Sequence, residues 1–329
     1  MEIAILGCGN WGSVFAIIQS RNGHLVRIWE FDRPRARRVS ATRDNRPFLT
    51  GHSLPASILV SADLRRVMTD ADLVVFALPC QVLPQVVAKV SKTGVRSPLY
   101  LSLIKGIDIR TLRLPTRTIR LGLGQHNRVY ALSGPSIANE IIRGEPTAVV
   151  LVGPATAAAQ ELQNELSTEN LRIYLGRDTV GVELAGAVKN VLAIAAGICD
   201  GLGLGANIRG TLIARGLVEL QRLGKRMGAL RETFWGLSGV GDLITTATSG
   251  ESRNHRAGQM LGKGLTVGEI RDKMVMVAEG IPTARAVHDL AARHGIEMPI
   301  CEMVFRIIYQ RMPARQGLRN LMSRPLKGE

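Results

Sequence analysis

Lys189 is the first candidate for chemistry in this sequence of 329 residues. It lies in a stretch from Glu183 to Gly205, ELAGAVKNVLAIAAGICDGLGLG, whose aliphatic residues recur at helical spacing. Apolar neighbours remove water from an ammonium group, which moves its pKa toward neutrality and suits it to general acid–base catalysis. The alternative is a lysine that lies along the helix surface with its charged end in water. Asn190 follows directly and adds an amide.

A glycine-rich turn lies near the N-terminus. The sequence Gly7-Cys8-Gly9-Asn10-Trp11-Gly12 stands between an apolar run, Ile3 to Leu6, and a helix-like segment. This GxGxxG arrangement within a strand–turn–helix context indicates a dinucleotide-binding site, and an ordinary glycine-rich turn is the alternative. Gly7 permits the tight turn, Gly9 lets a pyrophosphate approach the backbone, and Gly12 lets helix and strand pack closely.

The residues after the second expected strand leave the type of nicotinamide cofactor open. Glu30 and Asp32 stand about 20 residues beyond the glycines, where an acid commonly binds the ribose 2′-hydroxyl of NAD. The segment from Arg33 to Arg38 is rich in arginine and could accept the 2′-phosphate of NADP. The sequence therefore predicts NAD(P) without choosing between the two forms.

A polar segment over residues 236–254, expected to be a loop between helices, carries groups that suit an anion. It contains glycines, hydroxyls, Asp242 and the sequence Ser252-Arg253-Asn254. An arginine beside an amide and hydroxyls suits a phosphate or a carboxylate. The same residues could cap a helix that begins near Arg253, with Ser252 as its N-cap, and a helix N-terminus also favours anions.

The pattern of expected elements divides the chain into two halves. Through about residue 180, short apolar runs alternate with helical stretches, which is typical of a mainly parallel, doubly wound sheet. The expected strands cover residues 3–6, 26–29, 57–60, 73–77, 99–102, 129–133, 148–152 and 172–175. Lys105 follows the expected strand 99–102, at the carboxyl ends of the strands, where ligands bind in sheets of this kind. A solvated loop lysine is the alternative.

Beyond residue 180, helical periodicity replaces the strand signals. We therefore expect an α/β Rossmann-type, doubly wound domain over residues 1–180 that binds a dinucleotide. An all-helical domain over residues 181–329 would bind the substrate and carry catalysis. Its basic end, 313–329, is expected to be frayed.

Charge and composition limit the classes of function. The formal net charge is +15, but only 4% of residues are aromatic and no nucleic-acid-binding module is present, so the charge favours small anionic ligands over nucleic acid. No uninterrupted apolar run has the length of a membrane span and no secretory leader is seen, so we expect a cytoplasmic protein without integral membrane association. The four cysteines lack ligand spacing and are expected to be reduced, mostly buried thiols, with no metal site.

Almost end to end, the chain resembles the bacterial-type glycerol-3-phosphate dehydrogenases that use NAD(P). The matching motifs are GCGNWG at 7–12, IKGI at 104–107, GPSIANE at 134–140, ELAGAVKNVLAIAAGICDGLGLGAN at 183–207, GVGDLITTATSGESRN at 239–254 and VAEG at 277–280. The resemblance implies reversible reduction of dihydroxyacetone phosphate, a small phosphate substrate, to sn-glycerol 3-phosphate for phospholipid synthesis. We expect a homodimer.

The resemblance also implies roles for individual residues. Lys189 would donate a proton to the developing alkoxide, Lys105 and Asp242 would flank the substrate, and Arg253 and Asn254 would bind its phosphate. Further substrate contacts fall on Gly134, Ser136, Asn190 and Ser252. Cofactor contacts fall on Asn10, Trp11, Phe31, Lys105, Ala138, Arg253, Val277 and Glu279, together with the glycines Gly7, Gly9 and Gly12.

Two positions depart from the family pattern. Ile104 stands where a serine or threonine is usual, and Phe31 stands where a basic or polar residue is common. Phe31 thus removes one expected contact with a 2′-phosphate. The alternatives are a two-domain reductase of the β-hydroxy-acid or ketopantoate type and a catalytically silent NAD(P)-binding sensor. Arg253 with Asn254 favours a phosphate ester over the other reductase substrates.

Overall fold

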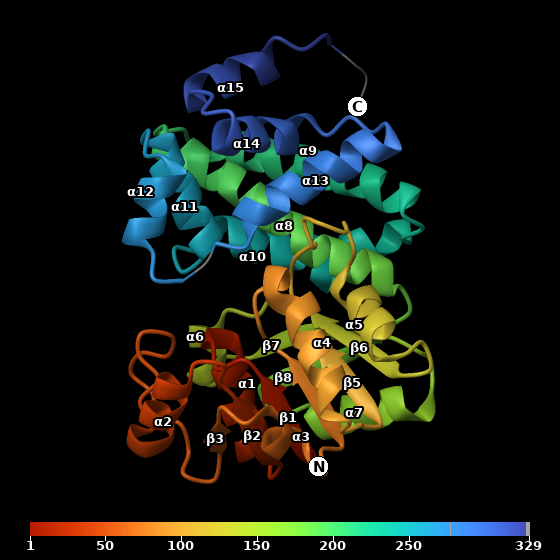
Figure 1. Cartoon of the computed structure of the whole chain (residues 1–329). Coiled ribbons are helices and arrows are strands. Elements are labelled where there is room, and N and C mark those ends of the chain that lie inside the picture. Colours follow the sequence, from red (N-terminus) through yellow and green to blue (C-terminus); the bar gives the residue numbers. More distant parts are fainter. Residues whose placement is uncertain (277, 327–329) are drawn as a thin grey trace. The chain divides into compact units, whose positions relative to one another are not determined.

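The computed structural model describes residues 1–276 and 278–326. The chain forms two compact units (Figure 1). The sheet unit comprises Met1–Lys105 and Arg113–Val182, and the helical unit comprises Gly106–Leu112 and Glu183–Glu329. The segment Gly106–Leu112 therefore belongs with the helices, although its position in the sequence placed it in the expected first half.

A single eight-stranded sheet forms the centre of the sheet unit. Its strands are β1 (Glu2–Leu6), β2 (Leu25–Trp29), β3 (Leu59–Ser61), β4 (Leu73–Phe76), β5 (Leu99–Ser102), β6 (Arg128–Ser133), β7 (Thr147–Val152) and β8 (Leu171–Gly176). Their spatial order is β3-β2-β1-β4-β5-β6-β7-β8. All neighbours are parallel except β6 and β7, which are antiparallel. The chain reverses its direction of travel across the sheet at β1, which makes the end of β1 a topological switch point.

Helices cover both faces of this sheet, because alternate strand residues point to opposite sides. Ile3 and Ile5 of β1 belong to a core with α1 (Asn10–Arg21), α6 (Ala138–Ile142) and α7 (Ala157–Leu166). Ala4 and Leu6 belong to a second core with α3 (Leu64–Met68), α4 (Leu83–Thr93) and α5 (Pro115–Leu123). The expected doubly wound, Rossmann-type architecture is confirmed.

The basic stretch after β2 forms a helix that the apolar pattern did not predict. This helix, α2, spans Arg33–Thr42 and buries only Ala36 and Val39. Its start is fixed by local chemistry: the Asp32 carboxylate accepts a hydrogen bond from the backbone N–H of Arg35, and a proline occupies the first turn. N-capping therefore forms this helix where hydrophobic periodicity is weak.

Every regular element of the helical unit is a helix in its described residues, as expected. The helices are α8 (Thr179–Gly201), α9 (Ala206–Arg226), α10 (Asp242–Thr248), α11 (Arg253–Gly262), α12 (Val267–Lys273), α13 (Gly280–His294), α14 (Pro299–Tyr309) and α15 (Ala314–Met322), with short helical turns at Arg231–Trp235 and Leu237–Gly241.

Two expectations for this unit are wrong. The polar segment 236–254 is not one long loop, because it contains α10. The expected frayed end contains α15, whose buried Gly317 lets the helix pack closely on Ile307 of α14. Gly317 is the one buried residue of α15, so close contact with α14 at this glycine holds the helix in place.

Small residues let α11 approach the long helix α8 closely. Gly197 and Gly201 on α8 lie against Gly258 and Gly262 on α11, and a methyl group on Gly258 would overlap the carbonyl of Ile194. By length and composition α8 could cross a membrane, but its apolar window is entirely buried inside the protein. Its apolar composition serves this packing. All four cysteine side chains are also buried, as expected.

Candidate functional site

The turn between β1 and α1 is shaped by its backbone. Gly7 has a φ of 123°, which disfavours any side chain, and a Cβ there would overlap the carbonyl of Ala77. A Cβ on Gly12 would overlap the carbonyl of Gly7. Gly9 differs, because among the described residues no atom beyond its chain neighbours lies within 4 Å of the position its Cβ would take. The outer glycines therefore permit close packing, and the middle glycine leaves open space beside the chain.

The start of α1 offers polar groups to this space. The N-cap residue of α1 is Gly9, and no side-chain cap is seen there in the part of the chain that the structure describes, so the first N–H groups of α1 can meet an anion. The side-chain oxygen of Asn10 is buried and has no hydrogen-bond partner in the described part of the chain. Trp11 and Ala138 pack against the core beneath α1. Open space, helix N–H groups and a buried acceptor all fit a dinucleotide.

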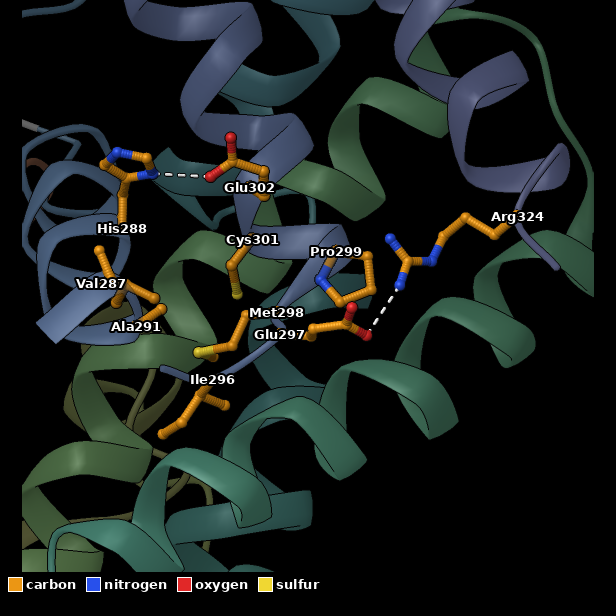
Figure 2. A pocket seen from close by; sticks show the side chains of 11 residues that line it. Val287, His288, Ala291, Ile296, Glu297, Met298, Pro299, Cys301, Glu302 and Arg324 are labelled. Carbon is orange, nitrogen blue, oxygen red and sulfur yellow. Dashed lines mark hydrogen bonds and ion pairs between the residues drawn. The ribbon is translucent and has the colours of Figure 1, made fainter. Parts of the chain in front are cut away.

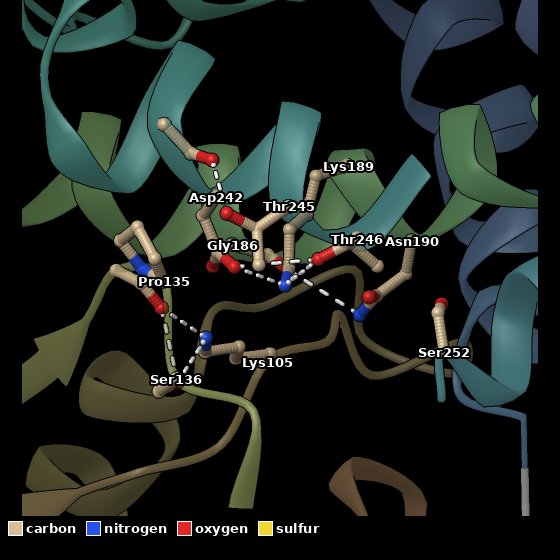
Figure 3. Close-up of polar contacts among 12 residues, drawn as sticks. Lys105, Pro135, Ser136, Gly186, Lys189, Asn190, Asp242, Thr245, Thr246 and Ser252 are labelled. Atoms are coloured by element: carbon tan, nitrogen blue, oxygen red, sulfur yellow. Dashed lines mark hydrogen bonds and ion pairs between the residues drawn. The ribbon is translucent and has the colours of Figure 1, made fainter. Parts of the chain in front are cut away.

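A second polar group in the sheet unit joins three of the predicted substrate residues. Lys105, after β5, donates hydrogen bonds from Nζ to the carbonyl of Gly134 at 2.8 Å and to Oγ of Ser136 at 3.0 Å (Figure 3). Ser136 Oγ also donates to the Gly134 carbonyl at 3.0 Å. Lys105 is thus held over the end of β6, where it can present a cation. Phe31, after β2, is 73% exposed.

Lys189 lies at the centre of a buried polar cluster in the helical unit. Its Nζ lies 2.5 Å from Oδ1 of Asp242 and 2.6 Å from Oγ1 of Thr246 (Figure 3). Lys189 is only 5% exposed and Asp242 only 1%. The structure thus excludes a lysine that lies along the surface with its charge in water. Lys189 and Asp242 therefore form a buried ion pair, in which each charge has its partner inside the protein. Together with the Thr246 hydroxyl, the cluster holds the Nζ group of Lys189 inside the helical unit.

Thr246 is a site residue that sequence reasoning missed. It lies four residues after Asp242 on α10, so the two side chains share one helix face, and their oxygens are 3.3 Å apart. That spacing was a usable signal only once the segment was known to be helical. The position of Asp242 beside Lys189 was implied by the family resemblance alone.

Asn190 and Asn254 tie three helices together. The Asn254 Nδ2 group donates to Asn190 Oδ1 at 2.9 Å, and Asn254 Oδ1 accepts from the backbone N–H of Gly280 at 2.8 Å. Asn190 Nδ2 donates to the carbonyl of Gly186 at 3.3 Å. Both amides are buried, so they fix α8, α11 and the start of α13 beside one another.

The remaining predicted residues lie at helix starts of this unit. Ser252 is the N-cap of α11, and its Oγ accepts from the backbone N–H of His255 at 3.2 Å. Arg253 is the first residue of α11 and is exposed. Glu279 occupies the N-cap position of α13. Val277 lies outside the described residues. A guanidinium at the start of a ten-residue helix can bind an anion, as expected from the sequence.

A pocket of about 240 Å³ in the helical unit contains none of the predicted site residues (Figure 2). His288 and Glu302 border it and lie 2.6 Å apart, and Glu297 and Arg324 form an ion pair at 3.0 Å. His288 also stacks on Phe305 with ring centres 3.8 Å apart. These polar groups bind one another, and Lys189 is not among the residues that line the pocket.

Comparison with known proteins matches both parts of the chain to one family. Residues 2–159 match the family model for the N-terminus of NAD-dependent glycerol-3-phosphate dehydrogenase, and residues 178–319 match the model for its C-terminus. The glycerol-3-phosphate dehydrogenase [NAD(P)+] of Dechloromonas aromatica is 43% identical, covering 100% of this chain and 99% of that protein. The corresponding protein of Geobacter sp. is 40% identical, covering 100% and 98%.

A solved structure gives the same result. The crystal structure of glycerol-3-phosphate dehydrogenase from Coxiella burnetii superimposes with a TM-score of 0.94 at 34% identity, and the match covers 98% of each chain. The likeness therefore extends through the sheet unit, the helical unit and the motifs around Lys189. The chain belongs to the NAD-dependent glycerol-3-phosphate dehydrogenase family.

Proposed function

We propose that this protein is an NAD(P)-dependent glycerol-3-phosphate dehydrogenase that reversibly reduces dihydroxyacetone phosphate to sn-glycerol 3-phosphate. The observation that carries the proposal is the buried cluster of Lys189, Asp242 and Thr246 in a chain of this family. A single ammonium held in an apolar setting beside a carboxylate suits a proton donor for carbonyl reduction.

The chemistry follows from what a ketone needs. Bound NAD(P)H supplies a hydride to the carbonyl carbon. Lys189 Nζ would give a proton to the carbonyl oxygen, so that the C=O double bond becomes a C–O single bond with one new C–H bond and one new O–H bond, and no free alkoxide is left. Asp242 keeps the amine protonated before the step, and Thr246 fixes the direction of Nζ through its hydroxyl. In the reverse direction the neutral amine takes the proton from the alcohol.

The anionic end of the substrate requires cationic groups. We assign Arg253 to the substrate phosphate. Its exposed position at the start of α11, with Ser252 beside it, supports this assignment. Asn254 and Asn190 are buried, and they are assigned to the positioning of this helix start relative to Lys189 as well as to substrate contact. Lys105, Gly134 and Ser136 are assigned to further substrate contacts.

The broader assignments follow from the same proposal. Residues 1–180 bind the cofactor through the glycine turn, Asn10, Trp11, Phe31 and Ala138, and residues 181–329 bind the substrate and carry Lys189. Lys105, Arg253, Val277 and Glu279 are assigned to cofactor contacts as well. The protein acts as a cytoplasmic homodimer and supplies sn-glycerol 3-phosphate for phospholipid synthesis.

An assay of cofactor oxidation tests the proposal. NADH and NADPH are each mixed with the protein and with dihydroxyacetone phosphate, dihydroxyacetone or ketopantoate. We expect rapid oxidation with dihydroxyacetone phosphate and negligible oxidation with the other two. Equal rates with and without the phosphate group would contradict a phosphate-binding role for Arg253. Faster oxidation with ketopantoate would assign the other reductase class, and cofactor binding without turnover would indicate a sensor.

A further inference from the structure

We propose that this chain selects NAD(H) over NADP(H), because carboxylates stand after β2 where a 2′-phosphate would need a cation, and Arg35 is committed to the glycine turn. The inference rests on the proposed dinucleotide binding and concerns residues of the sheet unit alone. It resolves the conflict between acids and arginines after β2.

Arg35 is directed into the protein and not toward a ligand. Its guanidinium donates to the carbonyl of Cys8 at 2.5 Å and to Oδ1 of Asn45 at 2.7 Å, and it pairs with Glu30 at 2.8 Å. The guanidinium also lies 3.9 Å from the centre of the Phe48 ring. Its side chain is only 18% exposed. A 2′-phosphate would have to break these contacts to reach it.

The same contacts fix the glycine turn from inside. Asn45 is fully buried, and its Nδ2 donates to the carbonyl of Cys8 at 3.0 Å and to Ser13 Oγ at 2.8 Å. The carbonyl of Cys8, between the first two glycines, therefore accepts hydrogen bonds from Arg35 and Asn45 together. Arg35 is a positioning residue for the turn, and it is needed for either cofactor.

Glu30 is held at the end of β2. It is 2% exposed, its Oε1 accepts from the backbone N–H of Asp32 at 3.0 Å, and its Oε2 pairs with Arg35. Burial raises the pKa of Glu30, while the Asp32 N–H and the Arg35 charge oppose the rise. Both oxygens of Glu30 are thus engaged inside the protein, so Glu30 acts on a cofactor through its charge, which repels a phosphate dianion but not an uncharged ribose hydroxyl.

The groups around Glu30 offer little to a 2′-phosphate. Phe31 is largely exposed and has no side-chain donor, and the carboxylate of Asp32 caps α2. Arg38 donates to two backbone carbonyls of the following loop. Arg33 and Arg37 are exposed, so their charges act through solvent and attract the pyrophosphate of either cofactor.

Titration calorimetry of the full chain with NADH and NADPH, without substrate, tests the inference. We expect NADH to bind at least about tenfold more tightly, because a like-charge contact is costly.

Phe31→Arg places a guanidinium at an exposed position and should tighten NADPH binding about tenfold, with little effect on NADH. Leu25→Arg adds the same charge at the opposite end of β2, where Leu25 is 65% exposed, and should leave the ratio unchanged. Glu30→Gln removes the charge but keeps the shape, and should also tighten NADPH binding.

The outcomes separate this inference from the proposed function. NADPH binding that equals or exceeds NADH binding would overturn the inference and leave the dehydrogenase proposal intact. Failure of both cofactors to bind would overturn the inference and the cofactor role together. Tighter NADH binding with a ratio that Phe31→Arg does not change would also overturn it, because residue 31 would then lie away from the ribose.

Discussion

The glycine turn and the Lys189 cluster are built in opposite ways. The turn consists of backbone: Gly7 and Gly12 permit contacts that no side chain allows, and the polar groups offered are N–H groups of α1. The cluster consists of side chains, with an ammonium and a carboxylate placed where water is nearly excluded. The turn therefore depends on glycines, which have no side-chain atoms to obstruct its contacts. The cluster depends on the pairing of opposite charges between Lys189 and Asp242. Substitutions should affect the two regions differently.

The largest effect on folding should come from the carboxylate of the cluster. Asp242→Asn leaves the Lys189 ammonium buried without its counter-charge, and such a change typically costs about 3–5 kcal/mol. Urea unfolding would measure the loss. Asp289→Asn is the control, because the Arg285–Asp289 pair is exposed and worth at most about 1 kcal/mol. Equal losses in the two variants would contradict the description of Lys189 and Asp242 as a buried pair.

Glu219 allows the contribution of a buried charge to stability to be tested by changing the pH. It is 3% exposed, and burial raises its pKa to about 7 although the N–H groups of Ile300 and Cys301 donate to it. Since the folded pKa lies above the ordinary 4.5, its stabilising contribution is complete below pH 4.5 and lost as pH rises through about 7. The difference in unfolding free energy between the wild type and Glu219→Gln should therefore change by about 3 kcal/mol over this range.

Glu302 serves as a control, because the pH dependence of its contribution to stability has the opposite sign to that of Glu219. Burial raises its pKa, but hydrogen bonds from Arg306 and His288 outweigh burial and lower it. Its contribution should therefore be present above pH 4.5 and lost as pH falls below that value. A Glu219→Gln variant with the same pH dependence as the wild type would show that Glu219 titrates normally in the folded protein.

Smaller effects on folding are expected at the turn, where substitutions of Gly7 and Gly9 should separate folding from binding. Gly7→Ala should cost about 1–3 kcal/mol and reduce nucleotide affinity, because of its positive φ and the Ala77 carbonyl. Gly9→Ala should change the unfolding free energy by no more than about 0.5 kcal/mol, because its methyl group enters open space. Its NADH affinity should nevertheless fall. Undiminished NADH binding by Gly9→Ala would place the pyrophosphate elsewhere.

The same contrast explains what could be predicted from the sequence. Each strand begins and ends within two residues of its expected bounds, because runs such as Leu99–Ser102 are apolar and short and are bounded by polar segments. The glycine turn could likewise be predicted from the sequence, since its residues lie within one short segment, 7–12. Helix α8 was expected from its apolar periodicity.

Features were less predictable where they depend on residues far apart in the sequence, on a helix cap or on tertiary packing. Lys189 and Asp242 are separated by 53 positions, and no spacing rule joins them. Helix α2 depends on the Asp32 cap and α15 on a close approach to α14, so neither shows a broad apolar stripe. Residues 106–112 join the helical unit through tertiary packing. From the sequence, Arg35 was one of four arginines that could accept a phosphate, but its partners in the structure are Cys8, Glu30 and Asn45.

Turnover of dihydroxyacetone phosphate by Lys189→Ala tests the central claim most directly. Lys225→Ala is the matched control, because Lys225 is an exposed lysine of the same unit. We expect Lys189→Ala to lower kcat by a factor of about 100 or more while NADH binding persists, and Lys225→Ala to retain normal turnover. Near-normal turnover by a folded Lys189→Ala variant would contradict the account.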